Sequence, residues 1–223
     1  CTATQPSLGD LLAAYAPGWP VEELCPQTAA LYERFRRVTF RREDALEDSA
    51  LAGRLGEHRQ VLCIVNSRRA TAAMLKSGAD HAATGENAVI VNSRRAAQRI
   101  YELLPREGSF HLSTLMIPAQ RQAFLHKIRE RLRRGEVCRV VSTSLIEAGV
   151  DVDFPLVYRE MAGLDSILQA AGRCNREGKR PIDESVVTIF ERTEPPPTLF
   201  RQTIGAAVEA LQGGRDPGAP ETM

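Results

Sequence analysis

Two arginines in the stretch "QAAGRCNREG" have the spacing to bind an anion. If this segment is helical, Gln169, Arg173 and Arg176 occupy positions i, i+4 and i+7, which share one face. The nearest acid, Glu177, directly follows Arg176 and is expected to point to another face. The two guanidinium groups would then repel each other unless an anion lies between them. The γ-phosphate of a nucleoside triphosphate is such an anion, whereas a solvated helix face is the alternative.

A second candidate for ligand binding is the segment "VVSTSLIEAGVDVDF". A run of β-branched residues ends in the hydroxyls of Ser142 and Thr143, and the chain then passes Gly149 to reach Asp151 and Asp153. Ligands of open parallel sheets bind at the carboxyl ends of strands, where hydroxyls and free backbone N–H groups suit phosphate oxygens. The acids suit a ribose hydroxyl or an ordered water. The alternative is an ordinary turn of an α/β protein.

Short apolar runs alternate along the chain with amphipathic segments, which predicts an α/β fold with a parallel sheet and helices on both faces. The expected strands are "VLCIVN" (61–66), "AVIVN" (88–92), "CRVVSTS" (138–144), "PLVYRE" (155–160) and "SVVTIF" (185–190).

Two helices that cover this sheet are expected at 93–104 and 119–134. The apolar stripes predicted for them are Ala97, Ile100, Tyr101 and Leu104 on the first, and Ala119, Ala123, Phe124, Ile128 and Leu132 on the second.

The heptapeptide "IVNSRRA" occurs twice, at 64–70 and 90–96, an offset of 26 positions. Two copies are too few for a repeat architecture, so we interpret them as a local duplication. The segment forms an extra strand-helix-strand unit, or only one copy contributes to the sheet. The sequence favours neither alternative.

Composition limits the general class of the protein. An apolar content of 43% suffices for a core, and a net charge of +1 excludes a general attraction to nucleic acid or membranes. The five cysteines form no CxxC pair and the four histidines are scattered, so no metal site is predicted. The cysteine pattern and the lack of a long apolar run favour a cytoplasmic protein without a membrane partner.

The segments described above resemble a known family when they are taken in order. "STSLIEAGVDVDFPLVYRE" followed by "GLDSILQAAGRCNREG" resembles motifs V and VI of superfamily 2 helicases. The residues in these two segments are similar to those of the CRISPR-associated helicase-nuclease of type I systems. "CTATQP" resembles motif III, "VLCIVNSRRA" the motif IV strand, and "FHLSTLMIPAQRQAFLHKIRERL" the segment before motif V. These segments cover most of residues 1–190.

The resemblance implies the C-terminal member of two RecA-like lobes, of the P-loop NTPase type, in an ATP-dependent single-stranded DNA translocase or helicase. Residues 1–36 would be the end of the first lobe and a linker, 37–195 the second lobe with a duplicated insertion near 64–96, and 196–223 a C-terminal helix and flexible tail. The chain would start at motif III as a fragment. It carries no GxxxxGK[ST] loop and no Walker B acid pair, so it should be inactive alone.

By the same resemblance, Arg173 and Arg176 would be arginine fingers, with Gln169 orienting them or the attacking water. Asp151 would face the ribose or the catalytic water, and Gly149 would let the backbone approach the nucleotide. One departure from the family is Ala170, where many superfamily 2 helicases have arginine.

The cofactor implied is ATP with Mg²⁺, held mainly by the first lobe. The partners implied are single-stranded DNA, the first lobe and HD nuclease domain of the same protein, and the Cascade surveillance complex. Thr2 and Thr4 would couple nucleotide state to lobe closure. The residues expected at the DNA backbone are Ser142, Thr143, Asn66 or Asn92, Ser67 or Ser93, and Arg121. The alternatives are a non-catalytic or degenerate nucleic-acid-binding module, and a superfamily 2 helicase acting on RNA.

Overall fold

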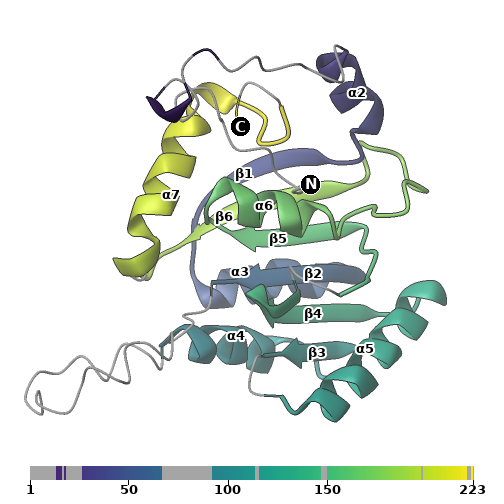
Figure 1. Ribbon diagram of the computed structural model, residues 1–223. Helices are drawn as coiled ribbons and strands as arrows, with labels where there is room; N and C mark the ends of the chain where they lie inside the picture. Colours follow the sequence, from purple (N-terminus) through teal and green to yellow (C-terminus); the bar gives the residue numbers. More distant parts are fainter. Residues whose placement is uncertain are drawn as a thin grey trace, which may run out of the picture.

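The computed structural model describes residues 14–16, 18, 27–66, 92–113, 116–146, 150–196, 198–219 and 222. Its centre is a six-stranded sheet in the order β1-β6-β5-β2-β4-β3, and every pairing is parallel (Figure 1). The strands are β1 (Thr39–Leu46), β2 (Gln60–Val65), β3 (Ser109–Leu112), β4 (Cys138–Thr143), β5 (Leu156–Glu160) and β6 (Val186–Arg192).

Helices cover both faces of this sheet, which confirms the predicted α/β class. They are α2 (Thr28–Phe35), α3 (Asp48–Glu57), α4 (Asn92–Leu103), α5 (Pro118–Arg133), α6 (Leu164–Ala171) and α7 (Thr198–Ala210), with short 3₁₀ turns η2 (Ser144–Ile146) and η3 (Gln212–Gly214). None of the described helices combines the length and apolar character needed to cross a membrane.

The alternation of side chains along the central strand β2 explains why helices pack on both faces of the sheet. Leu62 and Ile64 are buried in the cluster that contains residues of α5 and α6, whereas Val61 and Cys63 are buried with residues of α3 and α4. A strand that is apolar on both sides needs cover on both sides. The predicted strands at 61–66, 138–144, 155–160 and 185–190 are therefore confirmed.

Two strands escaped the sequence prediction. β1 reads "TFRREDAL", in which charged residues obscure the strand pattern, and β3 has only four residues, Ser109–Leu112. These are the two outermost strands of the sheet; β1 is largely exposed and so carries charged residues, whereas β3 is mostly buried but too short for a clear pattern. The expected strand at 88–92 lies mostly outside the described residues, and its last residue, Asn92, belongs to α4.

The predicted helix at 93–104 is confirmed as α4, with three members of its stripe buried: Ala97, Ile100 and Leu104. The helix α5 is also confirmed, but its predicted stripe is partly wrong. Ile128 is buried and Phe124 and Leu132 pack against the core, as predicted, whereas Ala119 and Ala123 are exposed and the buried Leu125 was not in the predicted stripe.

The two copies of IVNSRRA contribute different structures where they are described. The first copy supplies the end of β2 and Asn66, and the second supplies the start of α4 from Asn92 onward. Residues 67–91, including the possible extra unit, lie outside the described residues. The same heptapeptide therefore ends a strand in its first copy and begins a helix in its second.

The predicted C-terminal helix is present as α7, which packs on the domain. Its Ile204 and Val208 contact the buried cluster of Met161, Ile167 and Ile189. Arg36, just after α2, forms an ion pair of 2.8 Å with Asp216, so the segments before and after the sheet also touch each other.

Candidate functional site

The helix α6 ends earlier than the sequence predicts. It stops at Ala171, and Asn175 in the following turn has φ 46°, a left-handed conformation. Phe154 N–H donates to the Arg173 carbonyl and Asn175 N–H donates to the Phe154 carbonyl, both at 2.9 Å. These bonds take the backbone groups that a continuing helix would use. The prediction that Arg173 and Arg176 share a helix face with Gln169 is therefore wrong, and Gln169 lies exposed on α6.

Arg173 is buried beneath the turn, with 8% of its surface exposed. Its Nε donates to the carbonyl of Ile146 at 3.1 Å, at the end of η2. The side chain thus ties the turn after α6 to the segment that follows β4. These are the two segments that the sequence singled out for ligand binding.

Arg176 is accessible and has an acidic partner. Its Nε lies 2.7 Å from Asp151 Oδ1, and the two side chains are 44% and 76% exposed. Glu177 pairs instead with Lys179. The expectation that Arg176 faces an anionic ligand for lack of an acidic neighbour is therefore wrong, because Asp151 reaches it from another part of the chain.

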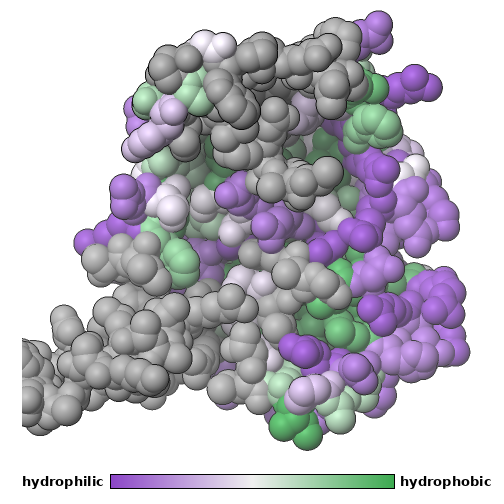
Figure 2. Space-filling view, viewed as in Figure 1, coloured by the Kyte–Doolittle hydropathy of each residue, from purple (hydrophilic) through white to green (hydrophobic). Residues whose placement is uncertain are grey.

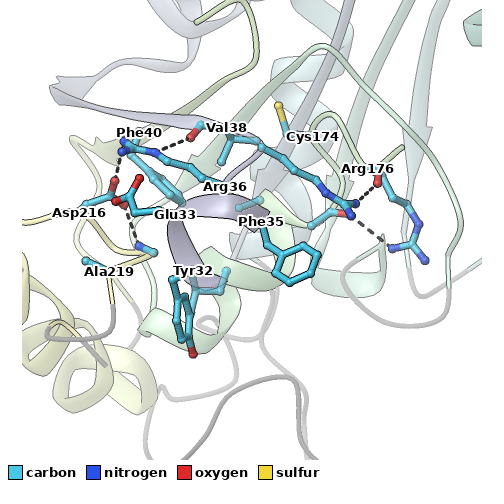
Figure 3. A pocket seen from close by; sticks show the side chains of 15 residues that line it. Tyr32, Glu33, Phe35, Arg36, Val38, Phe40, Cys174, Arg176, Asp216 and Ala219 are labelled. Atoms are coloured by element: carbon cyan, nitrogen blue, oxygen red, sulfur yellow. Dashed lines mark hydrogen bonds and ion pairs between the residues drawn. The ribbon is translucent and has the colours of Figure 1, made fainter. Parts of the chain in front are cut away.

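Two hollows adjoin this ion pair. Arg176 lines a cavity of about 920 Å³ between α2, the end of α6 and residues 216–219, where Phe35 and Phe40 also lie (Figure 3). Arg37, in the segment after α2, donates to the Arg176 carbonyl.

Asp151 lines the second hollow, of about 450 Å³, together with four cations: Arg129, Arg133, Lys179 and Arg180. The C-terminal half of α5, which supplies the first two, is covered by hydrophilic side chains (Figure 2). The ion pair between Arg176 and Asp151 thus stands between a cavity of mixed apolar and charged lining and a second one lined mainly by charged residues.

A buried polar cluster that the sequence analysis missed stands at the carboxyl ends of β2 and β5. Asn66 N–H donates to Glu160 Oε2 at 2.8 Å, and Asn66 Nδ2 donates to the Met161 carbonyl at 2.9 Å. Arg159 Nη1 donates to Asn66 Oδ1 at 2.8 Å. Burial raises the pKa of Glu160 above its usual value. The signal for this cluster was a charged pair at the end of the apolar run "PLVYRE".

The hydroxyls expected at the DNA backbone are not exposed. Ser142 and Thr143 are both 0% exposed, and Ser142 Oγ donates to the Thr143 carbonyl at 2.8 Å. Thr143 Oγ1 has no hydrogen-bond partner among the described residues. Asn66 is buried as well, so its side chain serves the strand ends in this structure.

The remaining predicted residues divide into described and undescribed positions. Arg121 lies half-buried in the first turns of α5, and Asn92 and Ser93 stand in the first turn of α4. Four predictions fall outside the described residues: Thr2, Thr4, Ser67 and Gly149. Within the described part of the chain, no group of His, Cys, Asp and Glu side chains could hold a metal ion.

The segments that contain Asp151, Arg173 and Arg176 are similar in sequence to a known protein family. A family model for the C-terminal part of the CRISPR-associated nuclease/helicase Cas3 matches residues 83–179, which include both arginines and Asp151. A second model, for a domain of unknown function, matches residues 49–101.

Two curated proteins are similar in sequence. The CRISPR-associated nuclease/helicase Cas3 of Haloferax volcanii is 42% identical over 72 residues, which are 32% of this chain and 8% of that protein. The CRISPR-associated helicase Cas3 of Thermoproteus tenax is 30% identical over 128 residues, which are 56% of this chain and 22% of that protein. The chain therefore matches only a small part of the length of these relatives.

The fold is shared with a solved structure. The crystal structure of T. fusca Cas3-ATP superimposes with a TM-score of 0.56 and 16% identity, covering 95% of this chain and 24% of the other. This chain is therefore similar in sequence to part of the CRISPR-associated Cas3 proteins, most clearly over residues 83–179, and it shares its fold with the T. fusca protein.

Proposed function

We propose that this chain is the second motor lobe of an ATP-dependent single-stranded DNA translocase or helicase of a type I CRISPR system. The observation that carries the proposal is the accessible guanidinium of Arg176, held by Asp151 beside the buried Arg173. These residues lie within the part of the chain that the Cas3 family model matches. An exposed ion pair is weak, so a stronger anion can displace Asp151 from Arg176.

The chemistry assigned to this lobe is stabilisation of charge on a transferring phosphoryl group. When bound, ATP with Mg²⁺ supplies the phosphoanhydride bond that is cleaved, and a preceding lobe would hold most of it. Arg176 can turn from Asp151 to a phosphate because its side chain is 44% exposed. Arg173 is too buried to move freely and would present its donors from a fixed position. The freed Asp151 carboxylate suits a ribose hydroxyl or the attacking water.

The nucleic-acid contacts are assigned to Arg121 and to the start of α4. Arg121 is half-buried on α5, and Asn92 and Ser93 begin α4, where free backbone N–H groups bind phosphate. Ser142 and Thr143 are buried and would support this surface from beneath. The other partners proposed are a first helicase lobe, an HD nuclease domain and the Cascade complex, in the cytoplasm.

The test compares this chain alone with a protein in which a first helicase lobe precedes it. We expect negligible ATP hydrolysis by the chain alone and DNA-stimulated hydrolysis by the two-lobe protein. Arg176→Ala should lower that rate about a thousandfold or more, as expected for loss of an arginine finger. Arg106→Ala, at an exposed position in the turn before β3, is the matched control and should leave the rate unchanged.

Two results would overturn the proposal. One is ATP turnover by this chain without a partner, and the other is an unchanged rate in Arg176→Ala. Stimulation by single-stranded RNA in place of DNA would support the RNA-remodelling alternative. Binding of single strands without any hydrolysis by the two-lobe protein would support a non-catalytic module.

A further inference from the structure

We propose that Asp153 is a positioning residue that presents Arg176 to the nucleotide, an inference that rests on the function proposed above. Asp153 Oδ1 accepts the backbone N–H of Arg176 at 2.7 Å, and Oδ2 accepts Arg180 Nη1 at 2.9 Å. Its side chain is only 18% exposed. One carboxylate therefore fixes the backbone from which the Arg176 guanidinium projects.

The turn on the other side of Arg176 is fixed by Asn175, which is 1% exposed. Its Oδ1 accepts the Arg180 N–H at 3.0 Å, and its Nδ2 donates to the carbonyls of Arg37 and Arg180, each at 2.9 Å. Asparagine is one of the few residues that readily adopt its left-handed conformation. Asp153 and Asn175 both bind Arg180, so the three residues form one rigid support for Arg176.

The two aspartates of "GVDVDF" have separate tasks in this arrangement. Asp151 is 76% exposed and holds the guanidinium of Arg176, whereas Asp153 is largely buried and holds its backbone. Only the first contact must break when the guanidinium meets a phosphate. The second can persist through the reaction and keep the side chain aimed, and a misplacement of about 1 Å at a reacting group costs on the order of a hundredfold in rate.

A carboxylate suits this task better than an amide would. Hydrogen bonds to a charged acceptor are shorter and stronger than neutral ones, and the charge also pairs with Arg180. Asp153→Asn keeps one acceptor oxygen for the Arg176 N–H but loses the ion pair. Asp153→Ala loses both contacts.

The test measures DNA-stimulated ATP hydrolysis in the two-lobe protein with a double-mutant cycle on Asp153 and Arg176. We expect Asp153→Ala to lower kcat about a hundredfold with little change in KM for ATP, because the aimed contact forms in the transition state. In an Arg176→Ala background, Asp153→Ala should have no further effect. Asp153→Asn should lower kcat about tenfold, and it carries the test if the alanine variant does not fold. Asp183→Ala, an exposed acid with no ion pair or side-chain hydrogen bond in the described structure, is the matched control.

Three outcomes contradict the inference: an unchanged kcat in Asp153→Ala, an equal loss in the presence and absence of Arg176, or a rise in KM alone. An equal loss in both backgrounds would mean that Asp153 only stabilises the fold. Failure of the proposed function is distinguishable, because it appears already as an unaffected rate in the single variant Arg176→Ala.

Discussion

Replacement of Arg159 by methionine tests whether the buried cluster at the ends of β2 and β5 stabilises the lobe. Arg159 is 2% exposed, and its Nη1 donates to Asn66 Oδ1 at 2.8 Å and to the Glu160 carbonyl at 2.6 Å. Methionine replaces the stem of the arginine but ends where Nε stood, so the main change is the loss of the guanidinium donors, and a small space is left where the guanidinium lay. A buried acceptor left without a donor costs about 1–3 kcal/mol, and two acceptors are affected.

We therefore expect Arg159→Met to lower the free energy of unfolding by about 3 kcal/mol, since removal of the buried charge offsets part of the loss. In a chain of this length that corresponds to a fall in Tm of about 6–12 °C. Urea unfolding followed by far-ultraviolet circular dichroism measures the change. Arg42→Met, which removes a surface pair with Glu191, should change stability by less than about 0.5 kcal/mol.

An unchanged or increased stability of Arg159→Met would refute the reasoning. It would mean that bringing the guanidinium out of water costs as much as its hydrogen bonds return, as happens for some buried ion pairs. The cluster would then determine how the strand ends are arranged without adding to the free energy of unfolding.

Three further predictions concern titration, thiols and the duplicated segment. Burial raises the pKa of Glu160, so the folded state binds its proton more tightly than the unfolded state, and stability should fall as pH rises from about 4.5 through the folded pKa. This decline should be absent in Glu160→Gln when unfolding free energies are compared across that range. Burial raises the pKa of Cys138 and of Cys174 to about 12, so mass spectrometry should show iodoacetamide labelling of both only after unfolding in urea. A variant lacking residues 67–92 retains one complete IVNSRRA, and we expect its circular dichroism melting to stay cooperative because β2 and nearly all of α4 are retained.

Strong periodicity made the central elements predictable. β2, β4, β5 and β6 are apolar runs because both faces of each are covered, and α4 shows its buried stripe directly in the sequence. β1 did not show this pattern. It holds its place by pairing with β6, a contact made across most of the chain that no local pattern reveals.

The candidate site was predicted in composition but not in geometry. The resemblance singled out Arg173, Arg176 and Asp151. In the structure Arg173 contacts Ile146, and Arg176 and Asp151 contact each other, two contacts that were not predicted. The helix through them was wrong because Phe154 binds the backbone on both sides of Cys174. That bridge joins residues far apart in the chain, so helical spacing alone could not anticipate it.

The neighbouring position of β1 and β6 determines how the lobe would bear mechanical load. Their partners run in parallel from Thr39 beside Val186 to Leu46 beside Arg192. A pull applied at Thr39 and Arg192 acts at opposite ends of this pair and slides one strand along the other. The hydrogen bonds between them are then strained together, whereas a peeling force would break them one at a time. A lobe that enters and leaves its sheet through such a pair resists traction between the segments on either side of it.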